Sequence, residues 1–419
     1  MKRTPRPALS RDARVLIVVQ GLRAAGYGFT AVVLGVLLAD RGYSPFQAGL
    51  VLTALIGGTA IASLLVGRLA DRIGLRRSYG WFFIALALAG AVVASGAPFW
   101  VLFVVALTGT LSTDVVDNGP ATTLEQVMLA SEDSGTAVVY GWYNATGAAA
   151  GALGALAAVV PGLVGAGHPA VSAVWFAALI PVGVAGGLLS LLLSPAVEGT
   201  PSTPPGAPGR RPVSRLGPSR RVVRRLAALF AVDAAGGGLV TTGFLAYFLS
   251  QRYGASLTEL GGLFFAISIV QAASVVVAPV LARRFGLIAT MVATHLPSNL
   301  ILITVAFAPT FSLAVVLLLV RTTLSQMDVP TRQALVMTVV TPGERTAAAA
   351  VTNASRYIVR PLGPLLAGAV QQLALGAPLV LAGLIKAGYD LALWGWARHL
   401  PQLANSANSA PTASTKEET

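Results

Sequence analysis

The 419-residue sequence contains no cysteine, and only 11% of its residues are charged. The absence of cysteine excludes disulfides, thiolate nucleophiles, iron–sulfur clusters and cysteine-bound zinc. An ordinary soluble domain has about 25% charged residues, so this composition excludes a water-soluble globular protein of the same length. The three histidines, His168, His295 and His399, lie far apart and show no metal-binding spacing. We therefore expect neither a metal nor a cofactor.

Apolar residues make up 55% of the chain and form twelve stretches that are long enough to cross a bilayer, which takes about 20 residues. The predicted spans are 15–39, 46–69, 78–97, 99–127, 136–160, 171–193, 226–249, 258–281, 286–306, 311–339, 346–370 and 377–397. The spacing of Gly147, Gly151 and Gly154 predicts close packing between helices. The sequence thus predicts an all-α membrane protein with twelve transmembrane helices.

The basic residues are distributed unevenly between the two sides of the predicted membrane. The side that holds both termini carries 21 lysines and arginines, whereas the other side carries only Arg41 and Arg252. Because such residues concentrate in cytoplasmic loops, we expect both termini to be cytoplasmic, in the cytoplasmic membrane of a bacterium. The lipid bilayer then explains the net charge of +13 without a nucleic-acid partner.

Composition divides the chain into four parts. We expect helical bundles at 1–193 and 226–400, a linker rich in proline and arginine at 194–225, and a disordered cytoplasmic tail at 401–419. The two bundles repeat each other at an offset of about 211 residues, most clearly where residues 69–75 match residues 281–287. The repeat predicts two pseudo-symmetric six-helix bundles with a small-molecule substrate bound between them, near the membrane midplane.

The loop between the second and third predicted spans reads G-R-L-A-D-R-I-G-L-R-R at residues 67–77. This loop resembles the G-x-L-a-D-r-x-G-r-r signature of the major facilitator superfamily, and the span count, linker and repeat extend the resemblance over the whole chain. It implies two bundles, expected to act as a monomer, that rock about a central cavity. The fifth span lacks the G-P-x-x-G-G-type signature of drug–proton antiporters. The resemblance implies a role in conformational gating for Gly67, Asp71, Arg72, Gly74 and Arg76.

Ionisable residues inside membrane spans are energetically costly and mark functional sites by default. Six acids and six bases lie within the predicted spans, which indicates pairing rather than a purely positive cavity. Glu125, Arg332 and Lys386 are interpreted as lying nearer a membrane interface, where long side chains can reach the headgroup region. The candidates for substrate binding or proton coupling are Arg23, Asp114, Asp117, Asn144, Asp233, Arg321, Asp328, Arg332, Arg356 and Arg360.

Position within the spans suggests partners for some of these charges. Arg23 and Asp233 occupy matching positions in the first and seventh spans, each about 12–13 Å from a basic flank at 1.5 Å per residue. We expect them to pair across the two bundles in one conformation. Asp328 and Arg332 are four residues apart and are expected to pair within one helix.

Two further features of the spans point to a binding region. Pro120 and Pro330 interrupt the long fourth and tenth spans, as in the binding or gating segments of transporters. Arg356 and Arg360 place two like charges on one helix face, which requires an anion or acidic groups nearby.

The leading interpretation is a secondary active transporter that moves a small solute by alternating access, with proton-coupled efflux of an amphipathic compound. The sequence contains no G-x-x-x-x-G-K-[ST] nucleotide-binding loop, and it shows no nucleophile–base or metal constellation, so we expect no ATP drive and no enzyme activity. One alternative is proton-coupled uptake of a small organic anion, which the central arginines favour. Another is a receptor or scaffold that has the same fold but does not transport.

The absence of native cysteine allows the orientation to be tested directly. In the single variants Ser202→Cys and Ser44→Cys, we expect a membrane-impermeant maleimide to label the two positions from opposite sides, with position 202 cytoplasmic. The measurement compares intact cells with inverted vesicles. Labelling of both positions from the same side contradicts the twelve-span topology.

Overall fold

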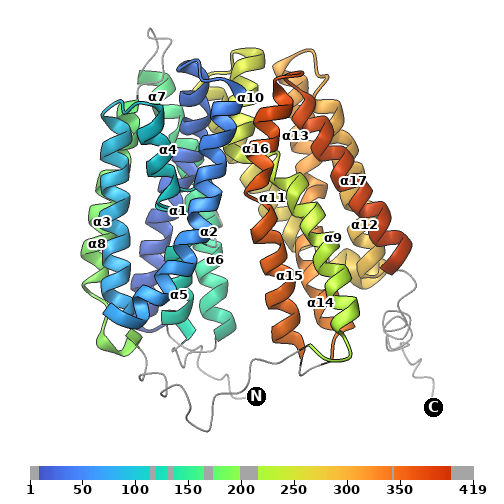
Figure 1. Cartoon of the computed structure of the whole chain (residues 1–419), viewed down its shortest axis with the longest axis horizontal. Helices are drawn as coiled ribbons and strands as arrows, with labels where there is room; N and C mark the ends of the chain where they lie inside the picture. The colour runs from blue at the N-terminus through green and yellow to red at the C-terminus, as the bar shows by residue number, and fades with distance from the viewer. Residues whose placement is uncertain are drawn as a thin grey trace, which may run out of the picture.

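The computed structural model describes residues 9–113, 119–130, 136–164, 173–198, 216–341 and 344–397. Within these residues the chain forms helices and no strand. The helices gather into an N-terminal half and a C-terminal half that touch at one end and diverge at the other (Figure 1). We call the diverging end the linker side, because the described chain leaves one half and enters the next there. The arrangement confirms the predicted all-α class.

The helices follow one another in the order of the two halves. The N-terminal half contains α1 (Arg11–Asp40), α2 (Pro45–Ile73), α3 (Leu75–Ala94), α4 (Phe99–Leu107), α5 (Pro120–Ala130), α6 (Thr136–Ala157), α7 (Val159–Val164), the 3₁₀ helix η1 (Ala173–Ala178), α8 (Leu179–Ser190) and the 3₁₀ helix η2 (Pro195–Glu198). The C-terminal half contains α9 (Arg220–Gly238), α10 (Thr242–Tyr253), α11 (Leu257–Phe285), α12 (Leu287–Val305), α13 (Phe311–Ser325), α14 (Asp328–Val339), α15 (Arg345–Val359), α16 (Leu362–Gln371) and α17 (Ala377–Ala397).

Ten helical segments of the described chain are long and apolar enough to cross a membrane. They correspond to ten of the twelve predicted spans, and several combine two consecutive helices, such as α9 with α10. The other two predicted spans, 99–127 and 346–370, are each divided into two shorter helices. Ten of the twelve predicted spans therefore meet this criterion in the described residues, and these two do not.

Glycine and proline account for the two interruptions. Gly109 ends the first part of span 99–127 with a φ of +69°, and a Cβ atom added there would lie 2.5 Å from the carbonyl oxygen of Gly58. The chain resumes as α5 at Pro120, beyond residues 114–118, which lie outside the described residues. In the second span, α15 ends just before Pro361, which has no N–H to continue a helix.

The internal repeat is visible in local structure. Gly74 and Gly286 end α2 and α11 with φ values of +94° and +84°, a conformation that favours glycine. The beginnings of the same two helices carry capping boxes, in which Ser44 pairs with Gln47 and Ser256 with the glutamate three residues later. The halves therefore share turn chemistry as well as hydropathy.

Within the N-terminal half, α1 is almost fully buried and packs most extensively on α6. Glycine makes this contact close: a Cβ atom at Gly28 would overlap the carbonyl oxygen of Gly151, and one at Gly154 would overlap that of Ala25. The predicted packing role of the α6 glycines is confirmed, since main chain meets main chain there. In the C-terminal half, α12 packs on α17 and α9 on α15.

The two halves meet along α1 with α10, α2 with α16, and α6 with α11. Glycines again allow the contact, because Gly35 lies against the carbonyl oxygen of Gly243 and Gly49 lies against the main chain of Gly368. Next to this seam, the Tyr247 hydroxyl donates a hydrogen bond to a main-chain carbonyl of the N-terminal half at 3.0 Å. The seam lies at the end of α1 that faces away from the linker side, and it runs along α10 (Figure 1).

Carboxylates fasten chain segments at the linker side. Glu198 accepts hydrogen bonds from the main-chain N–H groups of Leu75 (2.7 Å) and Arg76 (3.1 Å), and thereby caps α3. Glu344 accepts a hydrogen bond from the N–H of Gly217. Hydrogen bonds from the Ser219 side chain, from Gly217 and from a threonine hydroxyl lower the pKa of Glu344 below its usual value.

The predicted domain boundaries fall partly outside the described residues. Residues 199–215 of the predicted linker 194–225 and the whole of the tail 401–419 are not described. The described ends of the predicted linker are helical, because η2 occupies Pro195–Glu198 and α9 begins at Arg220.

The α1–α6 contact generates a stability prediction. We expect Gly154→Val to lower the free energy of unfolding by at least about 1–3 kcal/mol, because the added side chain overlaps the α1 main chain. Gly141→Val is the matched control on the same helix, since a Cβ atom there meets no heavy atom within 4 Å. Thermal unfolding of the purified protein in detergent measures both variants. Equal shifts in the midpoint would contradict close packing at Gly154.

Candidate functional site

The N-terminal half contains a buried ion pair between α1 and α5. Arg23 donates to the carboxylate of Glu125 at 2.8 Å. The same carboxylate accepts hydrogen bonds from the hydroxyls of Tyr79 (2.6 Å) and Tyr143 (2.5 Å). Glu125, which is interpreted as lying nearer a membrane interface, is fully buried among these partners. Three donors thus enclose one carboxylate in a neutral, buried cluster.

The C-terminal half gathers its charges around Asp233 of α9. The Lys386 ammonium of α17 lies 2.5 Å from this carboxylate, and the Arg332 guanidinium of α14 lies 3.4 Å away. Arg332 also pairs with Asp328 at 2.7 Å, which confirms the predicted pair within one helix. Asp328 lies in the first turn of α14, where the helix dipole favours a carboxylate. Lys386 is buried rather than near an interface.

His295 of α12 extends this cluster towards a third carboxylate. Its Nδ1 atom forms a 2.8 Å hydrogen bond with Asp390 of α17, and its Nε2 atom lies 3.9 Å from Asp233. Asn299 donates to the second oxygen of Asp390 at 2.8 Å. The buried polar side chains therefore form a connected path from Asp390 through the imidazole to Asp233 and its two cations.

Sequence reasoning missed His295 as a site residue, because it considered the histidines only as metal ligands. It counted Asp390 among the six acids within the predicted spans but did not name it as a candidate. The depth of the two residues within the bundle could have indicated that they lie at the same level. His295 lies eight residues after the linker-side start of α12 and Asp390 seven residues before the linker-side end of α17. At 1.5 Å per residue both lie about 11–12 Å into the bundle, so their side chains are at the same level.

Arg23 and Asp233 do not pair in this structure, because each residue has its partner in its own half, and their pairing in another conformation stays a prediction. The repeat nevertheless relates them. An offset of 210 residues relates Arg23 to Asp233 and Thr122 to Arg332. Arg23 is hydrogen-bonded to Thr122 at 3.1 Å in the N-terminal half, and Arg332 is hydrogen-bonded to Asp233 at 3.4 Å in the C-terminal half. The physical reason for pairing within a half is that an unpaired buried charge is strongly destabilising. A partner on the same bundle neutralises it in any arrangement of the halves.

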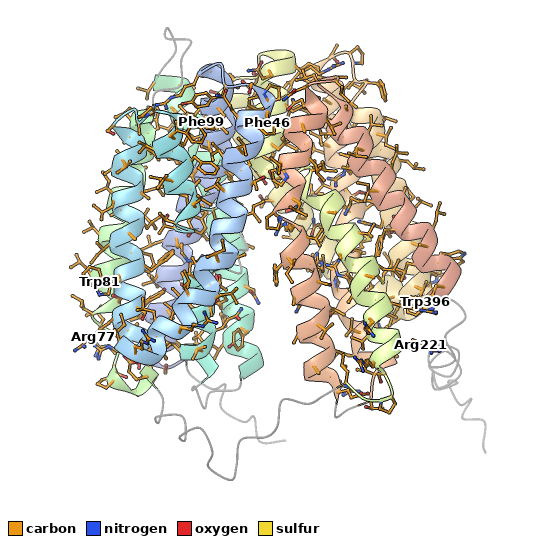
Figure 2. All side chains as sticks on the ribbon, viewed as in Figure 1. Phe46, Arg77, Trp81, Phe99, Arg221 and Trp396 are labelled. Atoms are coloured by element: carbon orange, nitrogen blue, oxygen red, sulfur yellow. The ribbon has the colours of Figure 1, made fainter. Side chains whose placement is uncertain are left out.

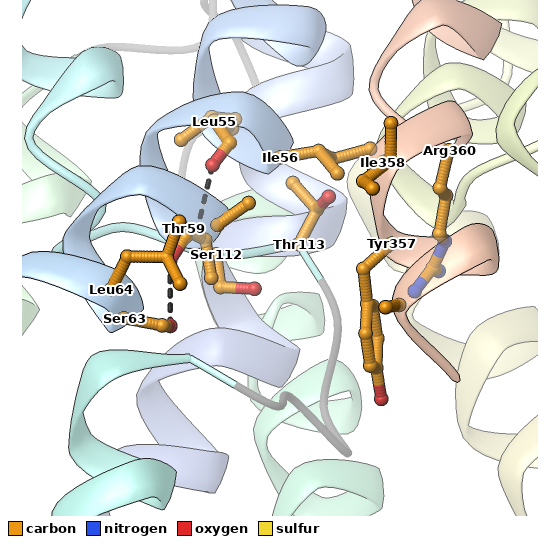
Figure 3. Close-up of a pocket in the computed structure, with 12 residues that line it drawn as sticks. Leu55, Ile56, Thr59, Ser63, Leu64, Ser112, Thr113, Tyr357, Ile358 and Arg360 are labelled. Carbon is orange, nitrogen blue, oxygen red and sulfur yellow. Dashed lines mark hydrogen bonds between the residues drawn. The ribbon is translucent and has the colours of Figure 1, made fainter. Parts of the chain in front are cut away.

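A cavity of about 360 Å³ lies between the two halves (Figure 3). The lining residues are Leu55, Ile56, Thr59, Ala60, Ser63, Leu64, Ser112, Thr113, Ala354, Tyr357, Ile358 and Arg360. Thr59 and Ser63 donate their hydroxyl protons to carbonyls of their own helix, which leaves their oxygen atoms to accept. Arg360 is the charged member of the lining. The cavity is thus mainly apolar, with hydroxyl groups on one wall and a phenol and a guanidinium on the other.

The remaining candidates are placed as follows. Asp114 and Asp117 lie outside the described residues. Asn144 is exposed on α6, and Arg321 is half-buried on α13; neither is among the cavity-lining residues. Arg356 lies one turn before Arg360 and is also half-buried, and its Nε atom has no hydrogen-bond partner in the described part of the chain.

The residues with a predicted gating role lie around the α2–α3 turn. Gly67 and Asp71 belong to the last turns of α2, but the side chain of Asp71 lies outside the described part of the structure. Arg72 is exposed, and Arg76 contacts Glu198 through its main chain. The start of α3 is capped by Glu198, which sequence reasoning did not identify. The gating role stays a prediction.

The buried clusters generate a coupling prediction. We expect Arg23→Met and Glu125→Leu each to lower the free energy of unfolding by about 3–5 kcal/mol, because each leaves an unpaired buried charge. The double variant is expected to lose less stability than the sum of the two single variants. Thermal unfolding in detergent and folded yield measure the cycle. Arg23→Met combined with Asp233→Leu is the control, and its effects are expected to add. Additivity in the first cycle, or equal coupling in both, contradicts pairing within the halves.

Three known proteins resemble the chain over most of its length. An uncharacterized membrane protein of Saccharomyces cerevisiae, YJR124C, is 25% identical over 397 residues, which cover 86% of this chain and 88% of that protein. The crystal structure of the nucleoside transporter NupG matches with a TM-score of 0.71 and 14% identity over 92% of this chain and 97% of its own. The human organic anion transporter MFSD10 (TETRAN) matches with a TM-score of 0.60 and 20% identity over 93% and 100%. These two structures show the shared fold.

The profile of the Major Facilitator Superfamily matches residues 16–364, from α1 into α16. The match includes helices of both halves and the charged residues of α1, α5, α9 and α14, whereas Lys386 and Asp390 of α17 lie beyond it. Together with the apolar spans, it identifies an integral membrane protein that is a transporter and not an enzyme. The chain therefore belongs to the Major Facilitator Superfamily.

Proposed function

We propose that the protein exports a small amphipathic compound by alternating access, in exchange for protons. The observation that carries the proposal is the composition of the cavity between the halves. Its volume of about 360 Å³ suits a small ligand, and ligand cavities are typically apolar with a few placed polar groups. The aliphatic side chains provide contact for an apolar body, and Tyr357 and Arg360 provide a polar edge.

The position of the cavity supports alternating access. Leu55 lies six residues beyond Gly49 on α2, which is about 9 Å along the helix, so the cavity begins on the linker side of the seam. With both termini in the cytoplasm, as the lysine and arginine distribution indicates, this is the cytoplasm-open state. A solute would enter from the cytoplasm, and closure of the linker side would release the seam.

The C-terminal charge cluster supports proton coupling. In direct ion pairs, Asp233 and Asp328 face the cations Lys386 and Arg332. The third carboxylate, Asp390, has His295 as its ion-pair partner, so a proton on the imidazole would give Asp390 a counter-charge. Histidine is the residue whose protonation normally changes within the physiological pH range. By contrast, the Arg23–Glu125 pair of the N-terminal half is already balanced and needs no proton.

Proton-coupled uptake of a small organic anion is the second candidate. Arg360 lines the cavity, and Arg356 adds a cation one turn away whose Nε atom has no hydrogen-bond partner in the described residues. A bound carboxylate or sulfonate would neutralise this excess positive charge, and a proton on His295 would increase the attraction. MFSD10, which shares the fold, is named as an organic anion transporter.

Proton movement in liposomes distinguishes these candidates. We expect the purified full-length protein, reconstituted with the pH indicator pyranine inside, to move protons when members of a panel of amphipathic cations and organic anions are added. The direction of the change in internal pH separates exchange from cotransport. His295→Gln and Asp390→Asn are expected to reduce solute-driven proton movement to the level of empty liposomes, because both remove the proton site between two carboxylates.

Thr338→Ala is the control, since this exposed hydroxyl on α14 bonds only within its own helix. It is expected to behave as the parent protein. Solute flux without proton movement contradicts proton coupling, and saturable solute binding with neither flux nor proton movement identifies a receptor instead of a transporter.

A further inference from the structure

A groove with a volume of about 880 Å³ runs along the outer face of the N-terminal half, between α3 and α8. Large side chains that are 48–72% exposed form its walls: Trp81, Ile84, Leu88, Val184, Leu188 and Leu191. Small residues form its floor, because Ala87 faces Gly183 and Gly80 faces Ser190. Arg77 and Trp81 point outward from α3 near the linker side (Figure 2). The groove therefore faces the hydrocarbon of the membrane.

The linker-side end of the groove is basic. Arg76 and Arg77 line it, and the Nε atom of Arg76 is buried without a hydrogen-bond partner in the described residues. Glu198 is the acid at this end, and its oxygens accept hydrogen bonds from the main chain of α3. The N-terminus of α3 thus offsets the negative charge of Glu198. The groove end offers guanidinium donors to a further acceptor.

The dimensions of the groove match one membrane leaflet. From Arg76 to Leu88 is twelve residues, or about 18 Å of helix, and half of a hydrocarbon core of ~30 Å is about 15 Å. We propose that the groove binds one anionic glycerophospholipid of the linker-side leaflet. Its phosphate lies at Arg76 and Arg77, and one acyl chain lies between α3 and α8. Trp81, one turn into the groove, lies at the depth where tryptophan contacts the headgroup region.

The internal repeat argues that this site is specific to one half. The alignment of residues 69–75 with 281–287 places Ile288 and Ala289 of α12 where α3 has Arg76 and Arg77. The C-terminal half therefore shares the fold of the turn but not its basic pair. The basic pair at the groove is therefore a feature of the N-terminal half alone and not of the fold that the two halves share.

Lipid titration of the purified full-length protein in detergent tests the proposal, with bound lipid counted by native mass spectrometry. We expect phosphatidylglycerol to bind more tightly than phosphatidylcholine. Arg77→Gln is expected to weaken phosphatidylglycerol binding about fivefold, the factor that one basic residue near an anionic surface provides. Arg284→Gln, an exposed arginine at the linker-side end of α11, is the matched control and should leave the affinity unchanged.

A second variant tests the acyl chain separately. Gly187→Leu fills the groove without displacing protein, because a Cβ atom there lies 3.8 Å from its nearest neighbour, Phe83. It is expected to abolish the preferential binding while the thermal midpoint stays the same. The proposal is overturned if phosphatidylcholine binds equally well, or if Gly187→Leu leaves phosphatidylglycerol binding intact. Complete displacement of the lipid by inorganic phosphate would also overturn it, because such a site would bind the phosphate alone.

Discussion

A charge inside a bundle of membrane helices is stable only beside a partner, and this constraint shapes both halves of the protein. Arg23 and Glu125 neutralise each other in the N-terminal half. Asp233 is held by Lys386 and Arg332 in the C-terminal half. Each pair links helices that belong to the same half. A movement of one half against the other therefore leaves these pairs intact, and the strong penalty for an unpaired buried charge does not oppose the movement.

The seam between the halves, in contrast, is formed by weak contacts. Glycines such as Gly35 and Gly243 allow main chains to touch there, and a phenol donates to a carbonyl at its edge. Net contributions of single hydrogen bonds are about 0.5–1.5 kcal/mol, well below the loss from breaking a buried ion pair. Strong contacts thus hold each half together, while weaker ones join the halves. This division of contacts is what a transporter that exposes its cavity alternately requires.

The features that the sequence predicted correctly depend on residues close together along the chain. Apolar runs define spans, and the spacing of Asp328 and Arg332 defines a pair on one helix face. The partners that it missed depend on how separate helices are rotated about their axes. The depth along each helix placed Arg23 level with Asp233, but depth does not specify which way a side chain points about the helix axis. Glu125, 102 residues away, faces Arg23 because α5 begins only after an interruption.

The same limit applies to the caps and to the histidine. Glu198 reaches the start of α3 from a 3₁₀ helix more than 100 residues later, and no local pattern connects the two. His295 and Asp390 come together because α12 packs on α17. A hydropathy profile shows His295 and Asp390 only as polar residues within apolar helices. The packing of the two helices makes each the partner of the other.

The carboxylate contacts at the linker side also define the connection between the halves. Glu198 is fixed to α3 and Gly217 to Glu344, so residues 199–216 are the segment between the two anchors. Eighteen residues span at most roughly 60–65 Å when extended, about twice the thickness of the hydrocarbon core. A connection of this length does not restrict how far the halves separate. It instead keeps them at a high effective concentration, which favours contact between the halves along the seam.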